Sequence, residues 1–154
     1  TKRPPWQIDG ETVDFGWVGD IDAVDPSLID GLLVRDLTPI VAPLGIDESG
    51  QVYNVNADTV ACAIATALTA QQILFVTGAG GVRRDADDPT SHLDTCDRAT
   101  FMAGVEAGWI DGGMRVKIET ALDALEKGVD SAVVCAPDDL LEQVHATEVM
   151  LRDA

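Results

Sequence analysis

Two apolar runs of strand length most constrain the fold of this chain. They are ILFVT at residues 73–77 and SAVVCA at residues 131–136. A strand that is apolar nearly throughout is expected to be covered on both faces, as strands of parallel sheets are. A helix-forming segment precedes each run, at about 57–70 and from about 112 to the stop at Gly128. This alternation predicts an α/β fold, a three-layer α/β/α sandwich with a mainly parallel sheet.

Weaker patterns predict the remaining elements. Apolar residues on odd positions in residues 12–24 predict a small β-hairpin or a bent strand pair near the amino end. TPIVAPL, residues 38–44, is typical of a short strand, and GIDESGQ after it is rich in turn residues. A helix is expected at about 97–107, and the stretch from Asp138 to the end is also expected to be helical.

A further helix is expected after Asp25 and Pro26, because aspartate caps helices and proline suits a first turn. Four of its residues have helical spacing and are expected to form a buried stripe: Leu28, Ile29, Leu32 and Leu33.

Composition restricts the functions to consider. The 154 residues suit one domain, and no apolar run approaches the roughly 18 residues of a membrane span. Without a secretory signal at the start, we expect a soluble, cytoplasmic protein with no membrane partner. The net charge of −17 disfavours a nucleic-acid partner, and it suggests a host with high internal salt.

Neither the cysteines nor the histidines suggest a metal centre. The three cysteines, Cys62, Cys96 and Cys135, are scattered, and the two histidines stand in polar surroundings. No pair has metal-ligand spacing, so no metal site is predicted. Cys62 and Cys135 lie in apolar segments and are expected to be buried thiols.

Ligands of parallel α/β sheets bind beyond the carboxyl ends of the strands, which points to the loops after Leu44 and Thr77. The second loop begins TGAGGV, and its glycines would let a backbone approach a phosphate closely. A plain turn is the alternative, since the spacing fits neither a P-loop nor a dinucleotide fingerprint.

Polar residues at two helix starts are candidates for binding chemistry. Lys117, one of three lysines, lies in the first turns of the helix that DGG introduces. There it would complement a bound anion. The alternative is that its side chain only extends over an apolar stripe. Asn56 suits the N-cap and Asp58 the first turn of the helix at 57–70, but capping leaves Asn54 unexplained.

Three stretches together resemble the acetylglutamate kinase family, within the amino acid kinase superfamily. They are VDFGWVGDI, PIVAPLGIDESGQVYNVNADTVACAIATAL and GWIDGGMRVKIETALDALEKGV, and the resemblance covers about residues 12–134. It implies an amino acid kinase-like fold and transfer of the ATP γ-phosphoryl group, with Mg²⁺, to the γ-carboxylate of N-acetyl-L-glutamate in arginine biosynthesis.

The resemblance also implies roles for individual residues. Lys117 would stabilise the transferring phosphoryl group, Asp58 would organise the catalytic lysines, and Asn54 and Asn56 would bind the amino-acid substrate. The nucleotide-binding residues would be Thr77, Gly78, Ala79, Gly80, Gly81, Val82, Arg83, Trp109, Ile110 and Asp111. Gly78 departs from the family, which usually has an aspartate at that position.

The resemblance implies that residues 1–154 form a single domain, the carboxyl-terminal ATP-binding part of the kinase. The amino-terminal half would supply another lysine, a Gly-Gly loop and a substrate-binding arginine, and we expect the chain to be a fragment that is inactive alone. Alternatives are a kinase of another acylated amino acid, such as N-succinylglutamate or an aminoadipate derivative, or a non-catalytic nucleotide-binding module. The resemblance also implies a homo-oligomer in full-length form.

Overall fold

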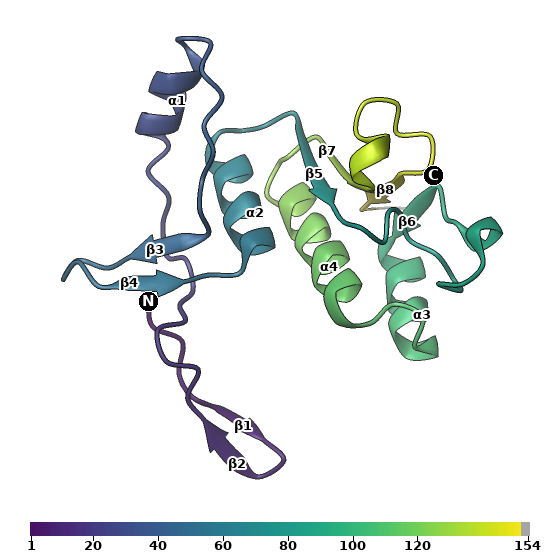
Figure 1. Ribbon diagram of the computed structural model, residues 1–154, viewed down its shortest axis with the longest axis horizontal. Coiled ribbons are helices and arrows are strands. Elements are labelled where there is room, and N and C mark those ends of the chain that lie inside the picture. The colour runs from purple at the N-terminus through teal and green to yellow at the C-terminus, as the bar shows by residue number, and fades with distance from the viewer. Residues whose placement is uncertain (152–154) are drawn as a thin grey trace.

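The computed structural model describes residues 1–151, and a four-stranded sheet of order β5-β7-β8-β6 lies at its centre (Figure 1). β5 (Gln72–Val76) runs parallel to β7 (Ser131–Cys135), and β6 (Thr95–Asp97) runs parallel to β8 (Thr147–Met150). Only the β7–β8 pair is antiparallel. The two apolar runs of the sequence therefore form neighbouring parallel strands, as predicted.

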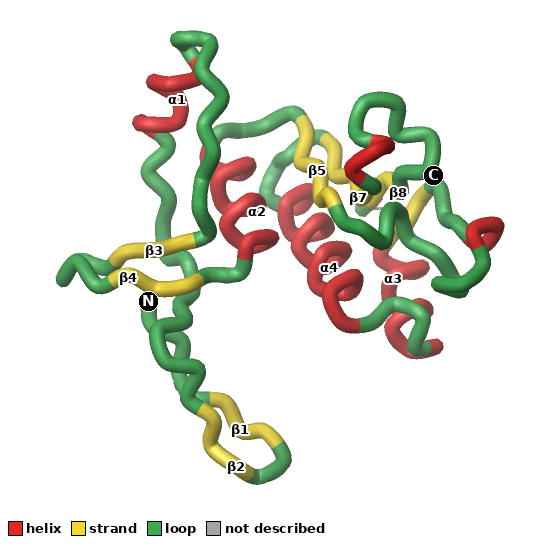
Figure 2. Tube along the Cα trace, in the orientation of Figure 1, coloured by secondary structure: helices red, strands yellow, loops and turns green. Residues whose placement is uncertain are grey.

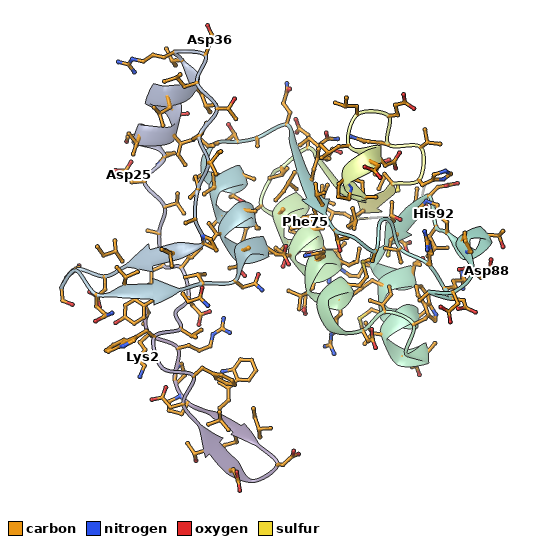
Figure 3. All side chains as sticks on the ribbon, in the orientation of Figure 1. Lys2, Asp25, Asp36, Phe75, Asp88 and His92 are labelled. Carbon is orange, nitrogen blue, oxygen red and sulfur yellow. The ribbon has the colours of Figure 1, made fainter. Side chains whose placement is uncertain are left out.

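Three helices pack against the sheet: α2 (Ala57–Ala67), α3 (Arg98–Ala107) and α4 (Gly112–Glu126) (Figure 2). Alternate strand residues, among them Phe75 and Val134, share one hydrophobic core with Ile118 and Leu122 of α4. Phe75 lies between β5 and α4 in Figure 3. The α/β class with a mostly parallel sheet is confirmed.

Residues 1–56, which we call the amino-terminal arm, stand apart from this sheet (Figure 1). The arm contains β1 (Trp6–Ile8), β2 (Glu11–Val13), α1 (Ser27–Leu33), β3 (Leu44–Ile46) and β4 (Val52–Asn54). β1 pairs with β2, and β3 with β4, each as an antiparallel hairpin.

The small hairpin near the amino end is confirmed, but it lies earlier in the chain than the predicted residues 12–24. Its turn is Asp9-Gly10, where both residues have positive φ, of 52° and 84°. Such a two-residue turn suits the twist of paired strands and fixes their register. The hairpin therefore occupies residues 6–13, and most of residues 12–24 follows it.

Two further predictions for the arm are wrong. Residues 38–43 form no strand, because a strand requires a pairing partner and β3, which begins at Leu44, pairs only with β4. The α1 helix exists, but it buries no residue: Leu28 is 75% exposed and Leu33 is 46% exposed. The other two residues of the stripe, Ile29 and Leu32, are only partly buried.

The helix predicted from Asp138 is also wrong within the described residues. A short 3-10 helix, Pro137–Asp139, leads into a loop and then into β8, and residues 152–154 lie outside the description. β8 alternates buried and less buried residues over only four positions, which is too short a pattern to identify a strand from the sequence. None of the helices in residues 1–151 is long and apolar enough to cross a membrane.

Candidate functional site

The carboxyl ends of β5 and β7 and the amino ends of α2 and α4 meet at one edge of the sheet. A short turn leads from α2 into β5, and another leads from α4 into β7. Each helix therefore runs antiparallel to the strand that follows it, and its amino end lies near the carboxyl end of that strand (Figure 1). The predicted loop after Thr77 lies at this edge. The loop after Leu44 does not: it is the tip of the β3–β4 hairpin, which is not part of this sheet.

Lys117 and Asp58 form a two-point ion pair between α4 and α2. The Lys117 Nζ donates to Oδ1 and to Oδ2 of Asp58, each at 3.0 Å. Both side chains are only about one-fifth exposed, at 20% and 19%. A partly buried, charge-assisted pair fixes the ammonium in one direction. The contact that the sequence predicted between Asp58 and a lysine is therefore present.

Asn54 and Asn56 both lie just before the start of α2, but their side chains have different surroundings. Oδ1 of Asn56 accepts a hydrogen bond from the Thr59 backbone N–H at 3.1 Å, so Asn56 is the N-cap of α2. That leaves its Nδ2 group as the donor available to a ligand. Asn54 ends β4 with an exposed side chain, while its backbone pairs with Trp17 and Gly19.

The hairpin turn before Asn54 is fixed by Asp47. Its carboxylate accepts hydrogen bonds from the Ser49 side chain, the Tyr53 hydroxyl at 2.8 Å and the Gln51 backbone N–H at 3.0 Å. These hydrogen bonds lower the pKa of Asp47 to about 2. Asp47 thereby sets the register of β3 and β4, and with it the position of Asn54.

The loop after β5 turns sharply at its glycines. The Gly80 N–H donates to the Thr77 carbonyl at 3.0 Å, and Gly80 has a φ of 73°. At Gly81 a Cβ atom would lie 2.8 Å from Thr147 Oγ1 and 2.7 Å from the His145 carbonyl. The two glycines are therefore required by the fold, whereas Gly78 has free space around it.

Val82 and Ile110 were assigned to the nucleotide, and the structure assigns their side chains to the core. Each is 1% exposed. The Val82 N–H donates to Thr147 Oγ1 at 2.7 Å, and its carbonyl accepts from the Leu93 N–H at 2.9 Å. Val82 therefore has no polar group left for a ligand and supports the loop instead. This role of Thr147 was missed, because a lone buried threonine gives no sequence signal.

The start of α4 has amide groups directed toward the same edge. Asp111 precedes the helix but makes no side-chain cap, so the first N–H groups, from Gly112 onward, have no partner within the helix. Apart from the helix's own backbone and the adjacent residues, no atom of residues 1–151 lies within 4 Å of a Cβ placed at Gly112 or Gly113. A helix start with free amides, open space and a nearby lysine suits an anion.

Two arginines follow the glycine loop. Arg84 lies over the ring of Trp109, with the guanidinium carbon 5.4 Å from the ring centroid, and so links the two predicted nucleotide-binding stretches. The Nε atom of Arg83 is buried and has no hydrogen-bond partner among residues 1–151. A buried N–H donor without a partner is uncommon in proteins.

Other features of the described residues do not form a competing site. An open cavity of about 390 Å³ is lined by Gln72 and Ser131, which begin β5 and β7, so it lies at the opposite ends of these strands. Residues 1–151 contain no cluster of three histidine, cysteine or acidic side chains able to hold a metal. The cysteines are buried as predicted for Cys62 and Cys135, and burial raises the pKa of Cys96 to about 11.

Comparisons with known proteins agree on the family. The family model described as the amino acid kinase family matches residues 3–136. The chain is 40% identical over 131 residues to a protein named acetylglutamate kinase from Methanothrix thermoacetophila, and 43% identical over 135 residues to one of that name from Methanopyrus kandleri. The chain itself is covered to 85% and 88% in these two alignments.

The matches cover only part of each known protein. The chain spans about half the length of these relatives, 45% and 55% respectively. A solved structure of N-acetylglutamate synthase from Neisseria gonorrhoeae superimposes with a TM-score of 0.79 and 23% identity, covering 99% of this chain and 36% of that chain. At this identity the structural likeness shows the fold alone.

Proposed function

Because the chain belongs to the amino acid kinase family, we propose that it forms the nucleotide-binding part of a kinase acting on N-acetyl-L-glutamate. The reaction transfers the γ-phosphoryl group of ATP to the γ-carboxylate of this substrate. The named relatives favour this substrate over other acylated amino acids and favour an enzyme over a non-catalytic module.

The observation that carries the proposal is the Lys117–Asp58 pair at the edge where the glycine loop and the start of α4 converge. Phosphoryl transfer needs little covalent chemistry from a protein, and it depends on positioning and on neutralising charge that spreads over the phosphoryl oxygens. A lysine fixed in direction before the reaction begins gives that stabilisation without reorganisation.

Each residue of the site then has a distinct role. The Lys117 ammonium contacts the transferring phosphoryl group, and Asp58 positions it. The free amides at Gly112 and Gly113, together with the loop Thr77–Gly81, bind the phosphate oxygens. Arg83, which follows the glycine loop, adds a positive charge. Asn54 donates its amide to the carboxylate of the acceptor, with the Asn56 Nδ2 group beside it.

Mg²⁺ fits this arrangement as an ion carried on the nucleotide phosphates. When bound, it neutralises part of the phosphate charge. We assign it no protein ligand. Trp109 and Asp111 complete the nucleotide site beside Arg84, and Ile110 holds them in place from the core.

In this proposal the protein serves arginine biosynthesis in the cytoplasm of a host with high internal salt. Residues 1–154 act as one domain, and the complete enzyme is a homo-oligomer that binds ATP and N-acetyl-L-glutamate.

The test is a hydroxylamine-trapping assay, which converts an acyl phosphate product to a coloured hydroxamate. It compares the 154-residue chain with a chimera in which this chain replaces the matched part of the Methanothrix thermoacetophila kinase. We expect no signal from the chain alone and a signal from the chimera that depends on N-acetyl-L-glutamate. Lys117→Ala abolishes that signal, while Lys127→Ala, in an exposed pair just after α4, retains it. An inactive chimera beside an active Methanothrix parent contradicts the proposal.

A further inference from the structure

The sheet contains a buried hydroxyl group that core packing does not explain. Thr147 in β8 is 0% exposed, and its strand partner Val134 and its same-face neighbour Val149 are buried and apolar. A hydroxyl in such surroundings costs free energy unless hydrogen bonds replace those it made with water. A valine would fill the same space without this cost, so packing alone gives no reason for a threonine at this position.

The Thr147 hydroxyl joins two loops that are far apart in the sequence. It accepts a hydrogen bond from the Val82 N–H at 2.7 Å and donates one to the Leu93 carbonyl at 2.6 Å. The Leu93 N–H in turn donates to the Val82 carbonyl at 2.9 Å. The three residues form a closed ring of hydrogen bonds, in which the side chain of Thr147 has to donate and accept at once. Among side chains of this size, only a hydroxyl does both well.

Both ends of the glycine loop are fixed by neighbouring strands. At one end, the Thr77 N–H donates to the Cys135 carbonyl at 3.0 Å, which continues the pairing of β5 with β7. At the other end, Val82 is held by Thr147. Between them the backbone passes so close to β8 that a Cβ at Gly81 would lie 2.8 Å from Thr147 Oγ1. The directions of the loop N–H groups therefore depend on the contact with Thr147.

Loss of this hydroxyl should turn the loop and leave the sheet intact. Both of its hydrogen bonds go to loops, so the pairing of β8 with β7 and β6 does not depend on it. Without the hydroxyl, the buried Val82 N–H loses its acceptor, which is costly. The peptide group between Gly81 and Val82 can relieve this cost by rotating, because glycine adopts many backbone conformations. That rotation displaces the loop amides to which the proposed function assigns the phosphate oxygens.

We propose that Thr147 is a positioning residue of the nucleotide site, whose hydroxyl fixes the loop Thr77–Gly81 in the orientation that binds phosphate oxygens. It acts through the loop backbone and touches no ligand itself, because its side chain is fully buried. The inference rests on the proposed function, since the orientation of the loop matters only if the loop binds a nucleotide.

The test measures the affinity of the 154-residue chain for ATP and ADP by titration calorimetry at molar KCl, together with urea unfolding of the same samples. Thr147→Val keeps the shape of the side chain and removes the hydroxyl. It should weaken nucleotide binding by about 10-fold, which corresponds to the loss of one hydrogen bond. Thr147→Ser keeps the hydroxyl and loses only the methyl group, so it should bind within about 3-fold of the parent.

Val149→Ala is the control that separates positioning from stability. Val149 is 2% exposed and lies two residues further along β8, so its truncation lowers the urea midpoint without touching the ring of hydrogen bonds. Its nucleotide affinity should match that of the parent. Thr147→Cys is used if Thr147→Val does not fold, because a thiol fills the space but forms only weak hydrogen bonds. It should bind nucleotide more weakly than Thr147→Ser.

The results distinguish this inference from the proposed function. The inference is overturned if the variant without the hydroxyl binds nucleotide as tightly as the parent. It is also overturned if Thr147→Ser or Val149→Ala loses as much affinity as Thr147→Val, because affinity would then follow stability alone. In both cases the parent still binds and the proposed function stands. A folded parent that binds neither nucleotide overturns the proposed function, and the positioning role with it.

Discussion

The Lys117–Asp58 pair should couple α4 to α2 more strongly than an exposed ion pair does. At 3.0 Å the two charges attract by roughly 5 kcal/mol in a medium of effective dielectric near 20. Desolvation offsets much of this, because each side chain is about four-fifths buried. We expect a net coupling free energy of about 1–3 kcal/mol.

The assay is a double-mutant cycle on the 154-residue chain, with Asp58→Asn, Lys117→Met and the double variant followed by urea unfolding. Removing Asp58 alone should cost more than removing both partners, because it leaves the ammonium partly buried without a counter-charge. Circular dichroism at the helix band reports α2 and α4 together.

The matched control is the Lys127–Asp123 pair on the same stretch of chain. Its side chains are 52% and 47% exposed, and an exposed pair at this spacing contributes about 0.3–0.5 kcal/mol. Equal coupling in the two cycles would refute the reasoning, since it would show that burial and two-point geometry add nothing at Lys117.

Four further predictions test the site and the charge of the chain. In the chimera, Lys117→Ala should lower kcat by about 100-fold or more with little change in nucleotide affinity, as expected of a group that acts in the transition state; turnover within a few-fold of the parent would remove Lys117 from catalysis. Asn54→Ala should raise the KM for the amino acid more than the KM for ATP, and an unchanged amino-acid KM would leave Asn54 without a binding role. The pKa of Asp47 is lowered from 3.8 to about 2 in the folded state, so its contribution to stability is present above about pH 4 and disappears as the pH falls through 2. The Asp47→Asn variant should therefore lose less stability over this pH range than the parent. Equal losses would argue against a stabilising role of the Asp47 carboxylate. Raising KCl from low to molar concentration should raise the melting temperature, because screening weakens the self-repulsion of a net charge of −17, and an unchanged melting curve would count against this.

The sequence predicted the body of the fold better than the arm, and the reason is physical. Packing partners for β5, β7, α2 and α4 all lie within the chain. Their sequence patterns therefore correspond to the elements that form. Thr38–Leu44 is apolar like a short strand, but an apolar segment becomes a strand only when a neighbouring strand supplies hydrogen bonds. The same holds for the apolar stripe on α1, none of whose residues is fully buried.

Within the candidate site, the charged and capping residues could be predicted from the sequence. Which side chains are buried, and which backbone N–H groups are already hydrogen-bonded, could not. Asp58 and Lys117 stand out as polar residues at two helix starts, and they meet. The assignment of Val82 and Ile110 to the nucleotide came from their places in the resembling stretches, and the structure uses both side chains in the core. Only the fold shows that the Val82 N–H is already bound to Thr147, a residue 65 positions away.

Equilibrium binding of ATP and ADP to the 154-residue chain, measured by titration calorimetry at molar KCl, tests the central claim most directly. The account predicts saturable binding at one site, weakened by Arg83→Ala and unaffected by Lys127→Ala. If a folded chain binds neither nucleotide, or if both variants behave like the parent, the edge formed by the glycine loop and the start of α4 is not a nucleotide site.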